Sequence, residues 1–252
     1  MWFDETTKIP ILSQKPDLNT TGDASFGNNA TQNWSIEPQA GFDLQNGRKG
    51  KLSVLTGLSL QASNTKSSTI SGSGYSNDLL LESISGAAIR NAENDKSQYR
   101  YKGVFMRINY QYDERYLINL TGRRDGSSRF GPDKRHAHFG AVGAAWIFTK
   151  ENFLQKQKIL TFGKLRGSFG VTGNDQIKNY QYLDSWLNGY YGYLGNATIQ
   201  PNKLFNSDYS WEQIRKKEIA IELGFLRNHI FLTASHYNAK SDNQIVNYPL
   251  PS

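Results

Sequence analysis

Residues 33–45 read NWSIEPQAGFDLQ, a stretch in which apolar and polar side chains alternate strictly. The apolar phase consists of Trp34, Ile36, Pro38, Ala40, Phe42 and Leu44. Successive side chains of a β-strand point to opposite faces of the sheet, so this pattern predicts a strand with one apolar and one polar face.

The same period of two recurs along the rest of the chain. It is cleanest at residues 104–112, 164–171 and 218–225, and it predicts eight strands: 33–45, 50–62, 99–111, 115–125, 137–148, 161–172, 216–226 and 229–240. These strands average about 12 residues, whereas strands of globular proteins usually have about 5 to 6. The sequence therefore predicts an all-β, antiparallel, up-and-down sheet of unusually long strands.

A sheet with one apolar and one polar face is stable in two environments. In a water-soluble β-sandwich the apolar faces meet in a core, whereas in a transmembrane β-barrel they face lipid and the polar faces line a lumen. The mean hydropathy of −0.62 and the lack of a long apolar run exclude a spanning helix. A spanning strand needs only about 9 to 11 residues, so alternation alone leaves both environments open.

The connections between the strands favour the barrel. Tight turns at 46–49, 112–114 and 227–228 alternate with the longer segments 63–98, 126–136 and 173–215. The exception is 149–160, a connection of a dozen residues at a position where a tight turn is expected. Outer-membrane barrels have short turns on the periplasmic side and long loops outside, so residues 1–32, 63–98 and 173–215 are expected to be extracellular. Tyrosines on the apolar phase flank one tight turn and indicate either an interfacial girdle or an aromatic cluster at a sandwich edge: Tyr110, Tyr112 and Tyr116.

Composition limits the possible functions. Lysine and arginine number 29 against 22 acidic residues, a net charge of +7 that would suit nucleic acid, anionic lipid or an acidic substrate. The densest basic segment, 123–136, lies on a Gly/Ser/Pro-rich turn and contains carboxylates that can pair with its cations. We therefore expect a self-paired hairpin loop there and no nucleic-acid partner. The absence of cysteine excludes disulfides and thiolate chemistry.

No pattern in the chain predicts an enzyme, a cofactor or a metal site. His136 and His138 share one strand face, but no third ligand is indicated. Glu218 and Glu222 lie four residues apart on one strand, about 13 Å, which is too far for a glycosidase pair.

Aromatic side chains crowd the part of the segment 173–215 between Tyr180 and Tyr193, where Tyr180 and Tyr182 precede Trp186, Tyr190, Tyr191 and Tyr193. Exposed rings can stack on sugar faces or cover apolar parts of a ligand, although they can equally pack the loop against its neighbours. The candidate ligand-binding residues are Trp186, Tyr190, Tyr191 and Tyr193.

Several ordered motifs resemble a known family. The run from Tyr116 to Gly131, YLINLTGRRDGSSRFG, is similar to a hallmark segment of the SusC/RagA-type TonB-dependent outer-membrane transporters of Bacteroidetes. Segments similar to the following strands of that family occur in the expected order: Ala144-Ala145-Trp146, Lys164 to Asn174, Glu218 to Asn228, and Val246 to Ser252. The resemblance extends over nearly everything from Asn33 onward.

The resemblance implies an outer-membrane importer of oligosaccharides or peptides. Such a protein would work with a SusD-like surface lipoprotein and with the TonB complex, which acts through a plug domain. In a barrel of about 22 strands, residues 33–240 would form part of the wall, with 1–32 as an extracellular loop or extension and 241–252 as the start of a further loop. No secretory signal or plug is recognised in the sequence.

The polar wall face would contribute lumen-facing side chains from Arg107, Asn109 and Arg166. Two other interpretations remain open at this stage. One is a self-contained eight-stranded outer-membrane barrel with a structural or adhesive role, and the other is a soluble carbohydrate-binding β-sandwich.

Overall fold

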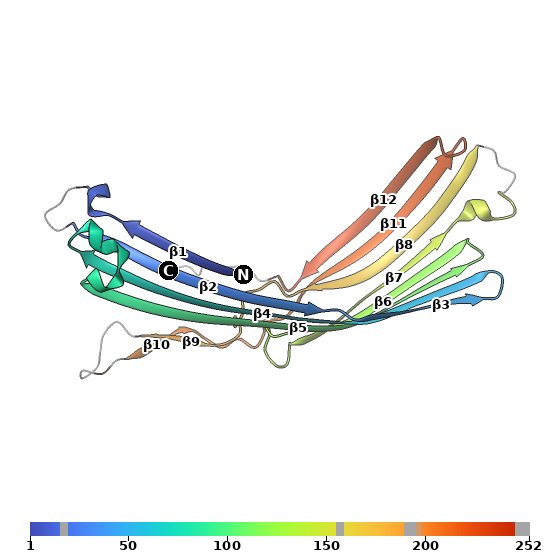
Figure 1. Cartoon of the computed structure of the whole chain (residues 1–252). Helices are drawn as coiled ribbons and strands as arrows, with labels where there is room; N and C mark the ends of the chain where they lie inside the picture. Colours follow the sequence, from blue (N-terminus) through green and yellow to red (C-terminus); the bar gives the residue numbers. More distant parts are fainter. Residues whose placement is uncertain (16–19, 155–158, 189–195, 197, 245–252) are drawn as a thin grey trace, which may run out of the picture. The chain divides into compact units, whose positions relative to one another are not determined.

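A computed structural model describes residues 1–15, 20–154, 159–188, 196 and 198–244, and Figure 1 shows the arrangement of its elements. Within these residues the chain is almost entirely β-structure with four short 3-10 turns. The strands are β1 (Trp2–Ile9), β2 (Gly22–Ile36), β3 (Gln39–Asn46), β4 (Gly50–Tyr75), β5 (Ile89–Tyr112), β6 (Tyr116–Ser127), β7 (His136–Trp146), β8 (Leu160–Asn174), β9 (Ser185–Asn188), β10 (Ile199–Lys203), β11 (Glu212–Phe225) and β12 (Ile230–Asp242).

Ten of the described strands belong to one sheet. Its order is β1-β2-β4-β5-β6-β7-β8-β11-β12, with β3 also paired to β4, so nearly every strand is followed along the sheet by its successor in the chain. Strands β9 and β10 form a separate antiparallel hairpin. Since β1 and β12 are the two ends of the order, the sheet does not close on itself, and the predicted all-β, antiparallel, up-and-down wall is confirmed.

The predicted number of strands was wrong. All eight predicted segments are strands, but β1 and most of β2 occupy residues assigned to the extension 1–32, and β9 and β10 lie inside the predicted loop 173–215. Strands β4 and β5, with 26 and 24 residues, also extend well into the segment 63–98. The extensions of β4 and β5 are largely polar on both faces, as in QASNTKSSTISGSGY at 61–75, and so show little alternation.

Proline explains why one predicted strand is divided into two. The segment 33–45 continues from the end of β2 into β3 and is interrupted at Glu37 and Pro38. Proline has no N–H to donate to a sheet ladder. The carbonyl of Pro38 still accepts a hydrogen bond from the Leu58 N–H at 3.0 Å, which keeps β3 in register on β4.

The strands divide between two compact units. Unit 1 comprises Met1–Ser35 and Gln61–Arg100, and unit 2 comprises Ile36–Leu60 and Tyr101–Ser252. In unit 1, the 3-10 turns η1 (Ile11–Ser13), η2 (Asp78–Glu82) and η3 (Ile84–Gly86) connect the strands, and a small core packs Tyr75 and Leu81 against Ala24 and Ala87. In unit 2, η4 (Phe148–Lys150) joins β7 to β8, and a second core is built on Phe130, Ala137 and Trp211.

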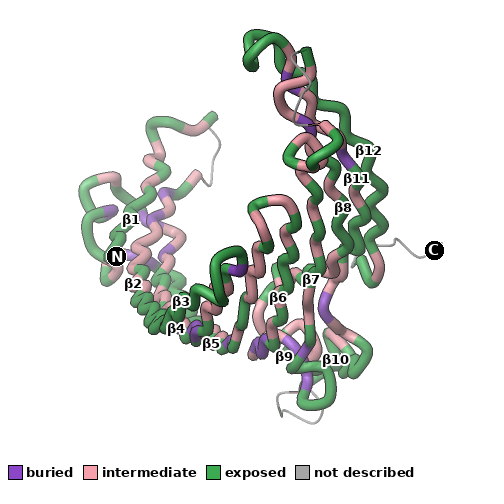
Figure 2. The backbone as a smooth tube through the Cα atoms, turned by 90° about the vertical axis from the view of Figure 1, so that its right-hand side faces the viewer, coloured by how far each residue is buried: buried purple, intermediate pink, exposed green. Residues whose placement is uncertain are grey.

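Among the described residues, the only buried apolar side chains outside these two clusters are those of Ala62 and Ala220, and most of the tube in Figure 2 is green or pink. The alternating apolar residues give the decisive case. Ile36, Ile118 and Phe169 are 56%, 45% and 41% exposed, and Val54, Ile108 and Ile221 are only half-buried. A soluble sandwich would bury these side chains, so the structure does not support that interpretation.

Candidate functional site: a wall with two chemically distinct faces

The apolar side chains form continuous rows across neighbouring strands. Register pairs Ile108 with Leu120, Leu120 with Val142, and Val142 with Phe169, so four apolar residues lie at one level of β5, β6, β7 and β8. A second row continues from Leu165 to Ile221 on β11 and Ala234 on β12. Because directly paired residues lie on the same face, this side of unit 2 is an apolar surface several strands wide.

Aromatic rings border one end of that apolar surface. Tyr112 pairs with Tyr116, and Tyr116 pairs with Trp146. The Tyr116 hydroxyl donates to Glu151 Oε1 at 2.6 Å, and Trp146 Nε1 donates to the same oxygen at 3.1 Å. This row has the composition of an interfacial girdle, with apolar ring bodies and hydrogen-bonding tips.

Glu151 joins the girdle to the turn beneath it. Besides accepting from Tyr116 and Trp146, it forms a 3.0 Å ion pair with Arg115 Nη1. The hydrogen bond from Tyr116, followed by those from Trp146 and Arg115, holds the pKa of the Glu151 carboxyl below its usual value. Sequence reasoning missed this role, which becomes visible only once strand pairing places Tyr116 beside Trp146.

The turn between β5 and β6 has left-handed backbone. Asp113 and Glu114 have φ values of 51° and 54°, as at the centre of a type I′ turn, and the Arg115 N–H donates to the Tyr112 carbonyl at 3.0 Å. The Asp113 carboxylate accepts from Arg115 at 3.1 Å and from Lys49 at 3.2 Å. The predicted tight turn is therefore confirmed. Ion pairs from Arg115 of the same turn and from Lys49 of the neighbouring turn stabilise it.

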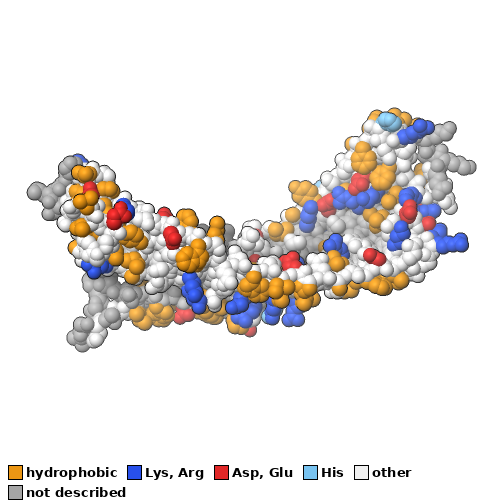
Figure 3. Space-filling model, viewed as in Figure 1, with side chains coloured by type: hydrophobic (Ala, Val, Ile, Leu, Met, Phe, Trp, Pro, Cys, Tyr) orange, Lys and Arg blue, Asp and Glu red, His pale blue; other side chains and the backbone are white. Residues whose placement is uncertain are grey.

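The opposite face carries a ladder of ion pairs on β8 and β11. Arg166 binds Glu218 at 2.5 Å and Glu222 at 3.1 Å. Lys164 adds a 3.4 Å contact to Glu222, and Lys216 a 2.9 Å contact to Glu218. Figure 3 shows these opposite charges side by side over β8, β11 and β12. Arg166 is thus on the polar face, and the two glutamates serve as its partners.

The other two predicted polar residues share that face on β5. Arg107 pairs with Thr121 of β6, and the side chain of Asn119 donates to that of Asn109. A groove of about 570 Å³ includes Asn109 and Asn119 in its lining, together with Asp43 and Lys51. These groups can donate and accept hydrogen bonds in water or to a polar molecule.

An ion pair lies within the basic segment 123–136, between Arg123 and Asp125. Arg123 Nε donates to both carboxylate oxygens of Asp125, at 2.6 and 2.8 Å, and the Asp125 side chain is 7% exposed. Arg129 binds the Asp175 carbonyl at 2.9 Å and the Asn179 side chain at 3.1 Å. The expected pairing within the loop is therefore found for Arg123, whereas Arg129 fastens the loop to the neighbouring segment at Asp175 and Asn179.

Of the four candidate ligand-binding aromatics, the structure describes only Trp186. It lies on β9, is 55% exposed, and donates from Nε1 to Asp184 at 3.0 Å. Tyr190, Tyr191 and Tyr193 lie outside the described residues. Near the same hairpin, Lys203 donates to Gln181 at 2.8 Å, and burial lowers the pKa of its ammonium.

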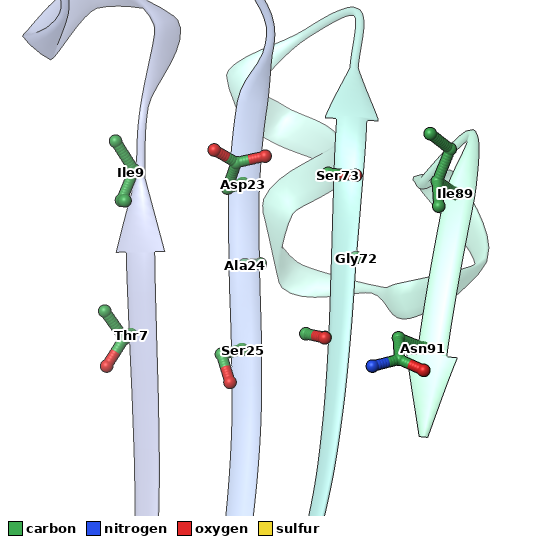
Figure 4. A pocket seen from close by; sticks show the side chains of 10 residues that line it. Thr7, Ile9, Asp23, Ala24, Ser25, Gly72, Ser73, Ile89 and Asn91 are labelled. Carbon is green, nitrogen blue, oxygen red and sulfur yellow. The ribbon is translucent and has the colours of Figure 1, made fainter. Parts of the chain in front are cut away.

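A smaller groove of about 230 Å³ lies on unit 1 and is lined by β1, β2, β4 and β5. Figure 4 shows Thr7, Ser25 and Asn91 at one level and Asp23 and Ser73 at another. The lining combines these polar side chains with Ile9, Ala24 and Ile89, and most of its surface is apolar.

Within the described residues, no three His, Asp or Glu side chains are grouped in a way that could hold a metal ion. None of the described helices is long and apolar enough to cross a membrane.

Comparison with known proteins identifies the family. A protein-family model described as TonB dependent receptor-like, beta-barrel, matches residues 8–252. The chain belongs to this TonB-dependent receptor family. The receptor chain is 28% identical over 253 residues to TonB-dependent receptor P26 of Formosa agariphila, a match that covers 95% of the chain and 25% of P26. It is 33% identical over 154 residues to the TonB-dependent receptor SusC of Bacteroides thetaiotaomicron, covering 58% of the chain and 15% of SusC.

Solved structures agree with the fold of this receptor chain. It superposes with a TM-score of 0.86 on a structure titled "Structure of the RagAB peptide transporter", at 23% identity, covering 98% of the receptor chain and 28% of the other. The receptor chain spans about a quarter of the length of P26. The predicted SusC/RagA resemblance and the outer-membrane location are confirmed, so the apolar face belongs to an outer-membrane protein.

Proposed function

We propose that this chain forms part of the wall of an outer-membrane importer that takes up oligosaccharides or peptides with a SusD-like surface lipoprotein. The observation that carries the proposal is the separation of the two faces: apolar rows left uncovered on one side, and an ion-pair ladder on the other. The family match and the similarity to SusC support an import role.

In this proposal the polar face lines the lumen. Arg166, held between two carboxylates, has little freedom to move, and Arg107 and Asn109 present donors beside the larger groove. Such a surface would pass hydroxyl-rich or peptide-like cargo through exchangeable hydrogen bonds. Energy would come from the TonB complex acting on a plug domain.

The end of the sheet that carries β9 and β10 would be extracellular, and the girdle at Tyr112, Tyr116 and Trp146 would mark the periplasmic interface. Residues 1–32, 63–98 and 173–215 would then lie toward the outside, and 241–252 would begin another external segment. Trp186, Tyr190, Tyr191 and Tyr193 would contact cargo at the entrance, where aromatic faces can stack on sugar rings or apolar side chains.

Uptake by cells tests the proposal. Deleting the gene should abolish TonB-dependent uptake of one labelled class, oligosaccharide or peptide, and a tagged full-length protein should co-purify a surface lipoprotein. Unchanged uptake of both classes would refute the import role. Trp186→Ala should weaken cargo binding, whereas Leu187→Ala, the adjacent exposed residue on the same strand, should not. Equal effects of the two variants would remove the cargo role of Trp186.

A further inference from the structure

A group of cations lies on the apolar face, at the end opposite the aromatic girdle. Lys102 and Val104 of β5 pair with Gly126 and Arg124 of β6, and Arg124 pairs with His138 of β7. Lys102, Val104 and Arg124 therefore share the face of Ile108, Leu120 and Val142, and not the face of Arg107 and Arg123. The basic side chains therefore lie at the end of the apolar surface.

A lysine and a histidine of this group converge over a glycine. A Cβ built on Gly126 would lie 3.0 Å from the His136 ring and 3.3 Å from Lys102 Cε. The lysine of β5 and the histidine of β7 thus reach toward each other across β6, in the space left by the missing side chain. Any larger residue at position 126 would occupy that space.

The cations border a groove with an apolar floor. Its volume is about 370 Å³, and it is lined by Leu58, Leu60 and Val104 together with Lys102, Arg124 and His136. All three apolar side chains are exposed, at 43%, 37% and 53%. Figure 3 shows basic side chains beside hydrophobic ones at the lower margin in the centre of the view.

In the described part of the chain, no carboxylate neutralises Lys102 or Arg124. Among the residues that the structure describes, neither Lys102 nor Arg124 forms an ion pair, although Lys8, Lys49, Lys150, Lys164 and Arg166 all do. The one carboxylate in the groove lining, Asp125, is bound through both oxygens to Arg123. The groove therefore presents positive charge above a surface suited to hydrocarbon.

We propose that this groove, formed by Lys102, Arg124, His136, Leu58, Leu60 and Val104, binds the phosphate-bearing headgroup and one acyl chain of an anionic membrane lipid. The phosphate would accept hydrogen bonds from the lysine and the arginine, and the acyl chain would lie on the leucines and the valine. This inference goes beyond the proposed import function, because it requires only that the apolar face contacts lipid and is independent of the cargo.

Native mass spectrometry of the full-length protein in detergent tests the site, with phosphatidylglycerol as the probe and phosphatidylcholine of the same acyl chains as the neutral comparison. The wild-type protein should retain phosphatidylglycerol preferentially. A basic residue near an anionic lipid surface contributes roughly fivefold in affinity, so the double variant Lys102→Gln/Arg124→Gln should bind about 30-fold more weakly. The matched control Lys51→Gln/Arg107→Gln removes the same charges from the polar face and should bind like wild type.

Heat-modifiable migration on gels should confirm that every variant is folded. Equal retention of phosphatidylglycerol by wild type and Lys102→Gln/Arg124→Gln would overturn the proposal, as would an equal loss in the control variant. Displacement of the lipid by millimolar inorganic phosphate alone would also overturn it, because the site would then recognise the free ion and not a lipid. Uptake assays remain a separate readout, so failure here leaves the import proposal standing.

Discussion

Replacing Val142 by arginine measures what the apolar face touches. Val142 is exposed and lies between Leu120 and Phe169 in the central apolar row. It is four residues from Trp146 of the girdle, which is about 13 Å along a strand and about 10 Å along the membrane normal at the usual tilt. An outer-membrane apolar band is roughly 25 Å tall, so Val142 lies near its middle.

Arginine at the bilayer midplane of a barrel costs about 2 to 4 kcal/mol, a change of roughly 30- to 900-fold in the folding equilibrium. The control is Ala141→Arg, an exposed neighbour that pairs with Thr121 and Gly170 on the polar face. Urea unfolding of the full-length protein in phospholipid vesicles, followed by tryptophan fluorescence, should show the full penalty for Val142→Arg and much less for Ala141→Arg. Equal penalties at the two positions would refute the assignment of faces.

Three further predictions concern other parts of unit 2. Glu151→Gln should lower stability at neutral pH, because the lowered carboxyl pKa contributes stability above the ordinary value of about 4.3 that is lost as pH falls through the folded-state pKa. The urea midpoints of variant and wild type should converge once the pH is below the folded-state pKa, and a difference that stays constant as the pH falls would argue against it. Gly173→Ala should destabilise the protein by roughly 1 to 3 kcal/mol, because the new Cβ would lie only 1.9 Å from Phe139 Cζ. Adding Phe139→Leu to the same chain should restore part of the lost stability. If thermal melting shows no such recovery, this contact is not the cause. Arg166→Cys should react with a charged, membrane-impermeant thiol reagent in intact membranes while Leu165→Cys is protected, and the reverse order of reactivity would invert the two faces.

Although the alternation in the sequence did not locate the separate hairpin of β9 and β10, it was sufficient to locate the strands that unit 2 contributes to the large sheet. There one face meets an apolar environment and the other a polar one, so segments such as 104–112 and 164–171 carry a two-residue period along their length. Periodicity alone could not say whether the apolar face contacts a lipid bilayer or a protein core. The family motifs from Tyr116 onward favoured the bilayer.

Unit 1 could not be predicted in the same way. The outer halves of β4 and β5 are polar on both faces, and β1 pairs with β2 through residues such as Asp4 and Asn28. Without alternation, these segments have the composition of loops. Backbone hydrogen bonds to neighbouring strands hold these segments in a β-conformation, and such bonds do not change the hydropathy pattern of the sequence.

The site residues were predictable by face but not by partner. Parity along a strand placed Arg107, Asn109 and Arg166 on the polar side. It could not indicate that Arg166 would bind Glu218 and Glu222 of a strand more than fifty residues away. It also gave no sign that Lys102 and His136 would converge across Gly126, since both observations depend on register between strands.

Quenching by brominated lipids tests the contact between the apolar face and acyl chains most directly. This chain has no cysteine, so Phe169→Cys and the adjacent Ser168→Cys can each be labelled with an environment-sensitive fluorophore. In vesicles of mid-chain brominated lipid, we expect strong quenching of the label at position 169 and little at position 168. Quenching at 168 and not at 169, or at neither position, would contradict the account.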